Sequence, residues 1–211
     1  MATITALAGI NGAGKSSVTG HYLRSKGGAY FNPDEAARAY RKQDPHLTQE
    51  EANSRAWLDG KILLEVAIRD DFDHVFETTL GGETIPRLLG EAVAAGHLVR
   101  VVFVGLESAD KHIERVRARV ARGGHDIAED TIRKRYRSSR LHLVQLLPAL
   151  GELVLFDNSL DADPASGHRP SLKRLLHMKG GVILHIEHDL GAAQGWAKPI
   201  LAAAMGFQSR A

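Results

Sequence analysis

The sequence predicts a three-layer α/β domain around a mostly parallel sheet of five or six strands. Short apolar runs rich in β-branched residues recur along the chain and alternate with amphipathic stretches of helical length. The run Leu98–Val104, LVRVVFV, is almost unbroken, as expected of a strand buried on both faces of a parallel sheet. Other strands are expected at residues 4–8, 29–31, 74–76, 153–156 and 180–186.

Helix start and stop signals stand between these runs. Asn32 before a proline predicts one start, and Thr48 with Glu51 forms a capping box ahead of a helix that reaches about residue 69. Residues 160–179 have weak periodicity, and we expect a surface loop followed by a short basic helix there. The remaining helices are expected at 83–95, 108–122, 129–147 and 190–204, and Gly96, Ser108 and Pro148 mark one end of each of the first three.

The composition is that of an ordinary globular chain. It has 211 residues, 44% apolar and 25% charged, a net charge of +2 and no cysteine. We therefore expect a single domain over 1–211, with a lid at about 108–140 and a C-terminal appendage at about 160–211. The N-terminus lacks a basic leader segment, and no run approaches about 18 apolar residues, so a cytoplasmic protein without a membrane partner is expected.

The stretch GINGAGKS at residues 9–16 fits the phosphate-binding pattern G-x4-G-K-[ST]. An expected strand precedes it and an expected helix over about 16–24 follows it, which is the context that this P-loop motif requires. Glycines allow successive backbone N–H groups to point at one anion, and the helix N-terminus adds partial positive charge. Lys15 is expected to reach the β- and γ-phosphates, and the Ser16 hydroxyl to coordinate Mg²⁺. The expected ATP-binding residues here are Asn11, Gly12, Ala13, Gly14, Lys15, Ser16 and Ser17.

Several classes of P-loop protein need motifs that this chain lacks. A GTPase requires a base-reading N-K-x-D motif, to which Asp157-Asn158-Ser159 does not conform. A motor or transporter ATPase requires an acidic pair at the end of a strand, whereas Leu98–Val104 runs into Gly105. The layout is instead that of a small-molecule kinase, with an acid after the second strand, a polar motif after the third and a late arginine-rich segment.

Two groups of polar residues follow expected strands, at the sheet edge where open α/β folds bind ligands. Asp34 can accept the proton of an attacking hydroxyl, or it can simply complement the dipole of its own helix. Glu77 can bind Mg²⁺ through water or hold a sugar hydroxyl, and Thr78 and Thr79 can hydrogen-bond the acceptor. The alternative is that these three residues only cap the next helix.

Arg115, Arg119 and Arg122 recur at helical spacing and are expected to line one face of the helix at 108–122. Guanidinium groups gathered on one face repel each other unless anions meet them, and phosphoryl-transfer transition states need such a clamp. The alternative is a solvated basic face. A second basic cluster, RKRYR, spans 133–137 and extends the positive field into the next helix.

The segments AGINGAGKSS, FNPDEAA, FETTLGG, RVRARVARGGHDIAEDTIRKRYRSS and LFDNS occur in this order at suitable intervals. Together they resemble the zeta-toxin / UDP-N-acetylglucosamine kinase family over about residues 3–160. The resemblance implies a nucleotide-kinase-like P-loop nucleoside-triphosphate hydrolase fold with a helical lid. It also implies ATP-dependent phosphorylation of a sugar hydroxyl of UDP-N-acetylglucosamine.

The resemblance also implies roles for single residues. Asp34 would be the base, Glu77 and Thr79 would bind the acceptor sugar, Arg115 would lead the lid arginines, and Asn158 would lie beside the adenine. Two departures concern the acceptor: Gly81 stands where the toxin branch tends to carry a basic residue, and His125 stands near the place of a second important arginine.

The sequence thus predicts an ATP- and Mg²⁺-dependent kinase that phosphorylates a hydroxyl of a small molecule, with a nucleotide sugar as acceptor. A nucleoside or nucleotide kinase and a nucleic-acid-linked P-loop ATPase remain the alternatives. An antitoxin protein is a candidate partner, and a nucleic acid is not expected. The catalytic residues are predicted to be Asp34, Lys15, Arg115, Arg119 and Arg122.

Overall fold

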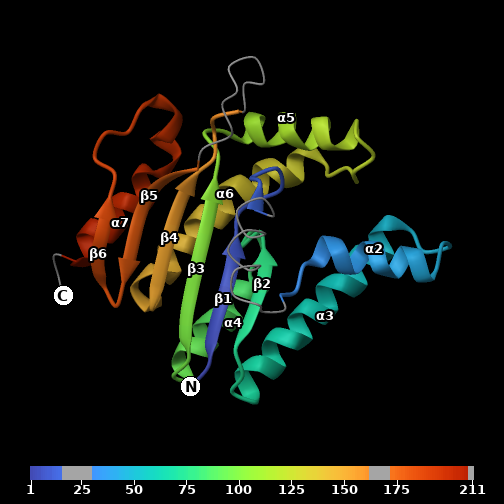
Figure 1. Ribbon diagram of the computed structural model, residues 1–211, viewed down its shortest axis with the longest axis horizontal. Helices are drawn as coiled ribbons and strands as arrows, with labels where there is room; N and C mark the ends of the chain where they lie inside the picture. Colours follow the sequence, from blue (N-terminus) through green and yellow to red (C-terminus); the bar gives the residue numbers. More distant parts are fainter. Residues whose placement is uncertain (16–29, 162–171, 209–211) are drawn as a thin grey trace.

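The computed structural model describes residues 1–15, 30–161 and 172–208. In these ranges six strands form one sheet in the spatial order β2-β1-β3-β4-β5-β6 (Figure 1). Neighbours among the first four strands are parallel, whereas β5 and β6 add antiparallel at one edge. The α/β class and the mostly parallel sheet expected from the sequence are therefore confirmed.

The strands are β1 (Thr3–Ala8), β2 (His74–Thr78), β3 (Leu98–Gly105), β4 (Glu152–Asp157), β5 (Lys173–Lys179) and β6 (Val182–Ile186). The α-helices are α2 (Pro33–Gln43), α3 (Gln49–Arg69), α4 (Thr84–Ala94), α5 (Ala109–Val120), α6 (Glu129–Leu146) and α7 (Lys198–Gln208). Two 3-10 helices are η1 (Leu147–Ala149) and η2 (Ala192–Ala197). The helix expected at 16–24 lies outside the described residues.

The predicted helix starts are confirmed by their caps. The Asn32 side chain accepts from two backbone N–H groups at the start of α2, and Thr48 and Glu51 form the reciprocal capping box of α3. Ser108 caps α5 in the same way. These caps satisfy N–H groups that a helix start otherwise leaves without partners, so short polar residues fix where each helix begins.

The main core lies between the sheet and helices α3, α4, α6 and α7 (Figure 1). Ile4, Val101 and Leu153 of the central strands are fully buried there, opposite Leu89 of α4 and Leu143 of α6. Each such side chain stabilises the fold by about 1.5–3 kcal/mol through loss of water contact. None of the helices in the described ranges is both long enough and apolar enough to cross a membrane.

The short basic helix expected within 160–179 is wrong, because residues 173–179 form β5 and pair with β4. Lys, Arg, Leu and Met are good helix formers, which explains the prediction. The strand is favoured because it pairs with the edge of β4 and buries Leu175, Leu176 and Met178 in the main core. The described part of the expected appendage, 172–208, thus extends the sheet and adds α7 to the core.

The parallel strands end together, and this positions the functional side chains. β1, β2, β3 and β4 point the same way, and α5 crosses their carboxyl ends, while α2 and α3 extend from the β2 side (Figure 1). Of the strand expected at 29–31, Phe31 forms a parallel bridge to Phe76, and the Glu77 N–H donates to the Phe31 carbonyl at 2.9 Å. The start of α2 therefore lies beside the end of β2.

Candidate active site

The P-loop follows β1 directly, and Lys15 stands at its end. The Lys15 Nζ donates to the Gly9 carbonyl at 2.7 Å, so the side chain folds back over the loop. Burial lowers the pKa of the Lys15 ammonium, and the carboxylates of Glu77 and Asp34 oppose that effect. Arg119 and Arg135 lower this pKa further. Two acids and two arginines from four separate segments therefore lie within electrostatic reach of Lys15.

Side chains from α5 and α6 hold the P-loop in place. The His112 Nδ1 lies 2.9 Å from the Asn11 carbonyl, and Arg135 Nη1 donates to the Asn11 side-chain oxygen at 2.9 Å. Gly12 has φ +83°, and a Cβ there would lie 2.8 Å from the His112 carbonyl oxygen. Glycine is needed at this position, because the loop adopts a left-handed conformation and touches α5 directly.

Asn158 meets the loop from the end of β4. Its Nδ2 donates to the Ala13 carbonyl at 2.8 Å, and a Cβ added to Gly14 would lie 2.5 Å from this nitrogen. The sequence prediction places Asn158 beside the adenine; in this structure its amide is bonded to the phosphate-binding loop. Of the expected ATP-binding residues, Asn11, Gly12, Ala13, Gly14 and Lys15 form one continuous loop, whereas Ser16 and Ser17 lie outside the described residues.

Asp34 lies in the first turn of α2 and faces α5. Asn32, not Asp34, accepts the backbone N–H bonds that cap this helix. The Asp34 carboxylate is 44% exposed and lies 3.8 Å from Arg119 Nη1 and 3.8 Å from His125 Nε2. The carboxylate is therefore available to a ligand, while one side chain of α5 and one of the segment after α5 flank it.

The three arginines predicted to share one face have separate partners. Arg119 lies beside Asp34 and donates to the His125 carbonyl at 3.0 Å, whereas its buried Nε has no acceptor among the residues that the structure describes. Arg115 pairs with Asp161 at 2.8 Å. Arg122 lies beyond the end of α5, and its Nε donates to the Ala118 carbonyl. The structure thus brings Arg119 to Asp34 and directs the other two elsewhere.

Arg135 is a site residue that the sequence did not single out, as is His112. Arg135 belongs to the RKRYR cluster, and the structure shows that its guanidinium donates to Asn11 of the P-loop. Burial lowers the pKa of its guanidinium, and the Asp34 carboxylate opposes this shift. A Cβ added to Gly81 would lie 2.6 Å from Arg135 Cγ, so the arginine stem also packs against the loop after β2. In the sequence nothing distinguishes Arg135 from the other basic residues of the cluster.

The end of β2 and the loop that follows it, residues 77–82, carry the expected acceptor-binding groups. Glu77 is buried near the carboxyl end of β2, and its charge acts on Lys15. The hydroxyl oxygens of Thr78 and Thr79 accept from the N–H groups of Leu80 and Gly81 at 3.0 and 3.3 Å. These bonds form two local turns ahead of α4, so both threonines retain a hydroxyl hydrogen that can point to a ligand.

The residues present fit a magnesium–nucleotide group. In P-loop sites Mg²⁺ is held mainly by substrate phosphates and water, with one or two protein oxygens. Within the described ranges no cluster of three or more metal-ligating side chains occurs. Glu77 supplies a buried carboxylate near Lys15, and the expected ligand Ser16 lies outside the described residues. This donor set suits an ion that arrives with its nucleotide.

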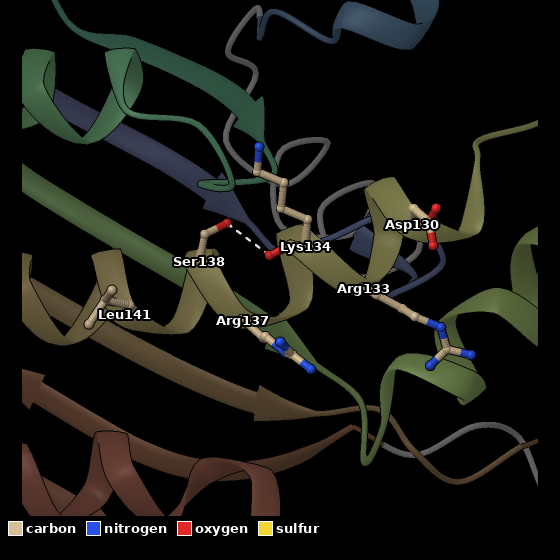
Figure 2. Close-up of a pocket in the computed structure, with 6 residues that line it drawn as sticks. All are labelled: Asp130, Arg133, Lys134, Arg137, Ser138 and Leu141. Atoms are coloured by element: carbon tan, nitrogen blue, oxygen red, sulfur yellow. Dashed lines mark hydrogen bonds between the residues drawn. The ribbon is translucent and has the colours of Figure 1, made fainter.

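The outward face of α6 carries most of the second basic cluster. A hollow of about 490 Å³ is lined there by Asp130, Arg133, Lys134, Arg137, Ser138 and Leu141 (Figure 2). Lys134 extends to one side of the helix, and Arg133 and Arg137 extend to the other (Figure 2). Arg133 pairs with Asp110 at 2.5 Å. The cations therefore diverge instead of meeting at one point in the hollow.

One relative with a similar sequence places the chain in a family, although no family model matches the chain. An uncharacterised protein of Haemophilus influenzae is 30% identical over 128 residues, which cover 61% of this chain and 88% of that protein. The chain belongs to the same family as this Haemophilus protein.

Solved structures share the fold at low sequence identity. A chain of the AvrRxo1-ORF1:-ORF2 complex, crystallised with ATP, matches with a TM-score of 0.67 and 16% identity over 97% of this chain. The match covers 64% of that neighbour, so this chain spans less than two thirds of its length. A chain of the PezAT toxin–antitoxin system of Streptococcus pneumoniae matches with a TM-score of 0.52 and 12% identity, over 99% of this chain and 86% of that chain. The resemblance to zeta toxins that the motifs indicate is confirmed at the level of the fold.

Proposed function

We propose that this protein is a kinase that transfers the γ-phosphoryl group of ATP to a hydroxyl of a small molecule, with a nucleotide sugar such as UDP-N-acetylglucosamine as acceptor. The observation that carries the proposal is the convergence of Lys15, Asp34, Glu77 and Arg119 at the carboxyl end of the sheet. Phosphoryl transfer needs a cation that holds the phosphate, a carboxylate that accepts the hydroxyl proton and an arginine that neutralises charge. Lys15, Asp34 and Arg119 would supply these groups. The zeta-toxin-like neighbours support this choice over other P-loop functions.

The chemistry assigns a role to each of these groups. The acceptor hydroxyl gives its proton to Asp34 as its oxygen bonds to the γ-phosphorus, and the bond from that phosphorus to the β–γ bridging oxygen breaks to release ADP. Lys15 holds the phosphate, and Arg119 neutralises charge that develops on it. Glu77, Thr78 and Thr79 hold the acceptor. Bound Mg²⁺ supplies charge neutralisation on the phosphates, and Ser16 and Glu77 are the residues that would hold it.

An antitoxin partner is the second part of the proposal. Chains of the AvrRxo1-ORF1:-ORF2 complex and of the PezAT toxin–antitoxin system share this fold. We infer that a protein partner which blocks access to Asp34 would regulate the kinase. Co-purification with the products of adjacent genes, followed by the kinase assay, tests this part separately.

The test of the kinase is an acceptor panel. The purified protein is incubated with ATP and Mg²⁺ together with UDP-N-acetylglucosamine, nucleosides, nucleoside monophosphates or single-stranded nucleic acid, and products are identified by mass spectrometry. A phosphorylated nucleotide sugar, absent with Asp34→Asn, is the expected result. Phosphorylated nucleosides would identify a nucleoside or nucleotide kinase instead. ATP hydrolysis that depends on nucleic acid, with no phosphorylated acceptor, would overturn the proposal.

A further inference from the structure

We propose that η2, far along the chain from the P-loop, is part of the nucleotide site. Trp196 and Gln194 act as positioning residues that fix the turn at Asp157–Ser159, and through this turn Asn158 braces the P-loop. The inference rests on the nucleotide-binding half of the proposed function. It extends that site to the C-terminal region, for which the sequence predicts no role.

Asp157 is the centre of this arrangement. It ends β4 with 2% of its surface exposed. Its Oδ1 accepts from Trp196 Nε1 at 2.7 Å and from Ser159 Oγ at 2.6 Å, and its Oδ2 accepts from Gln194 Nε2 at 3.1 Å. A carboxylate removed from water depends on such donors. Among the described residues no cationic side chain pairs with it, so η2 supplies two of its neutral donors.

The turn that Asp157 anchors reaches the P-loop one residue later. The Asn158 N–H donates to the Gly105 carbonyl at 3.0 Å, and its side chain donates to the Ala13 carbonyl at 2.8 Å. Ser159 Oγ also accepts from the Glu107 N–H at 2.8 Å. Asn158 is therefore fixed by residues on both sides, and its place against Ala13 depends on the bonds that hold Asp157.

The indole ring of Trp196 makes a second connection to the same region. A Cβ added to Gly105 would lie 2.2 Å from the ring, so the indole packs directly on the end of β3. Trp196, Ile10 of the P-loop and Tyr136 of α6 together line a cavity of about 10 Å³. This space holds at most about one water molecule, so we expect a shift of the indole to reach the loop.

The experiment compares variants that remove single donors with a matched core variant. Trp196→Phe keeps an aromatic ring but loses the N–H, and Gln194→Met keeps the chain length but loses the amide. Ile200→Val lies in α7, fully buried in the core, and its aliphatic side chain makes no hydrogen bond. We measure the Kd for ATP with Mg²⁺ by calorimetry and the amide hydrogen exchange of residues 9–15.

Both donor variants should raise the Kd for ATP by about 2- to 30-fold and speed exchange across the P-loop. Ile200→Val should change neither, even where its melting temperature falls equally. Trp196→Phe combined with Asn158→Ala should bind ATP no more weakly than Asn158→Ala alone, because both act through one contact. The KM for the acceptor should stay unchanged.

Wild-type exchange and wild-type affinity in both donor variants would overturn the inference, and so would additive losses in the double variant. The outcome for the proposed function is separate. ATP binding without any phosphorylated acceptor would contradict the kinase while the positioning role stands. If wild-type protein binds no ATP, the exchange experiment still decides whether η2 braces the P-loop.

Discussion

The imidazole Nδ1 of His142 lies 2.7 Å from the carbonyl oxygen of Leu80, so a buried histidine of α6 holds the loop that follows β2. Leu80 has φ +52°, a left-handed conformation that is uncommon for residues other than glycine. Ser138, one turn earlier on α6, donates to the next carbonyl, that of Gly81, at 2.7 Å. With Arg135 bonded to Asn11, one face of α6 sets the spacing between the P-loop and the expected acceptor loop.

Removing the His142 donor should destabilise the fold. His142→Leu leaves the buried Leu80 carbonyl without a partner, which costs about 1–3 kcal/mol. Ser138→Ala should cost less, about 0.5–1.5 kcal/mol, because its bond lies nearer the surface. Urea denaturation measures both, with His46→Leu as the control, since His46 is exposed and should change stability by less than about 0.5 kcal/mol. A His142→Leu protein as stable as the control would show that this bond does not hold the loop.

Adjacent glycines give a matched test of the contact between the acceptor loop and Arg135. A Cβ at Gly81 would lie 2.6 Å from Arg135 Cγ, whereas a Cβ at Gly82 meets nothing within 4 Å. Gly81→Ala should therefore displace Arg135, cost about 1–3 kcal/mol of stability and lower kinase activity. Gly82→Ala should stay within about 0.5 kcal/mol of wild type. Denaturation midpoints and kinase turnover are measured for both variants. Equal turnover in Gly81→Ala and Gly82→Ala would show that Arg135 does not take part in the reaction.

Local signals in the sequence were enough to predict most of the fold. The caps at Asn32, Thr48 and Ser108 place three helices, because capping depends on residues within one turn. The P-loop could be found for the same reason: its geometry follows from glycines at fixed spacing. β5 could not be predicted, because its strand conformation depends on pairing with β4 and on burial of Leu176, which are long-range effects.

The site was predictable only in part, for a related reason. Asp34 and Glu77 could be named because strand ends gather at one edge of a parallel sheet. Helical spacing predicts one face for Arg115, Arg119 and Arg122, but α5 ends at Val120 and each arginine has a different partner. Helix spacing also gives no information on which residue of a neighbouring helix reaches a loop.

Acid should destabilise the P-loop through His112. Burial lowers the pKa of this imidazole to about 3, the bond to the Asn11 carbonyl opposes the shift, and Lys15, Arg115 and Arg140 add to it. In the unfolded chain the pKa returns to 6.5, so between pH 6.5 and 3 the unfolded chain binds a proton that the folded chain does not. The stability contributed by neutral His112 is therefore complete above pH 6.5 and is lost as the pH falls toward 3.

Urea denaturation between pH 7 and 4 measures this dependence. His112→Asn keeps an N–H donor but does not titrate. Its unfolding free energy should therefore depend on pH less steeply than that of wild type, by up to about 1.4 kcal/mol per pH unit. His46→Asn, in which an exposed histidine is replaced, should leave the slope close to that of wild type. If His112→Asn and wild type lose stability in parallel below pH 6.5, another group is responsible for the acid sensitivity.

Comparing variants of Arg119 and Arg122 tests whether the reaction needs one particular arginine or only a basic surface. Arg119 lies 3.8 Å from Asp34 and carries a buried Nε with no described acceptor, so it can turn a donor toward a transferring phosphoryl group. Arg119→Ala should lower kcat by about 10²–10³-fold, the cost of losing one such donor, while the Kd for ATP changes little. Arg122→Ala should keep kcat within about twofold, because its guanidinium is bonded to its own helix end. Steady-state kinetics of both variants decide between the two roles: a kcat that falls equally in both would mean that overall positive charge, and not the contact with Asp34, supports the reaction.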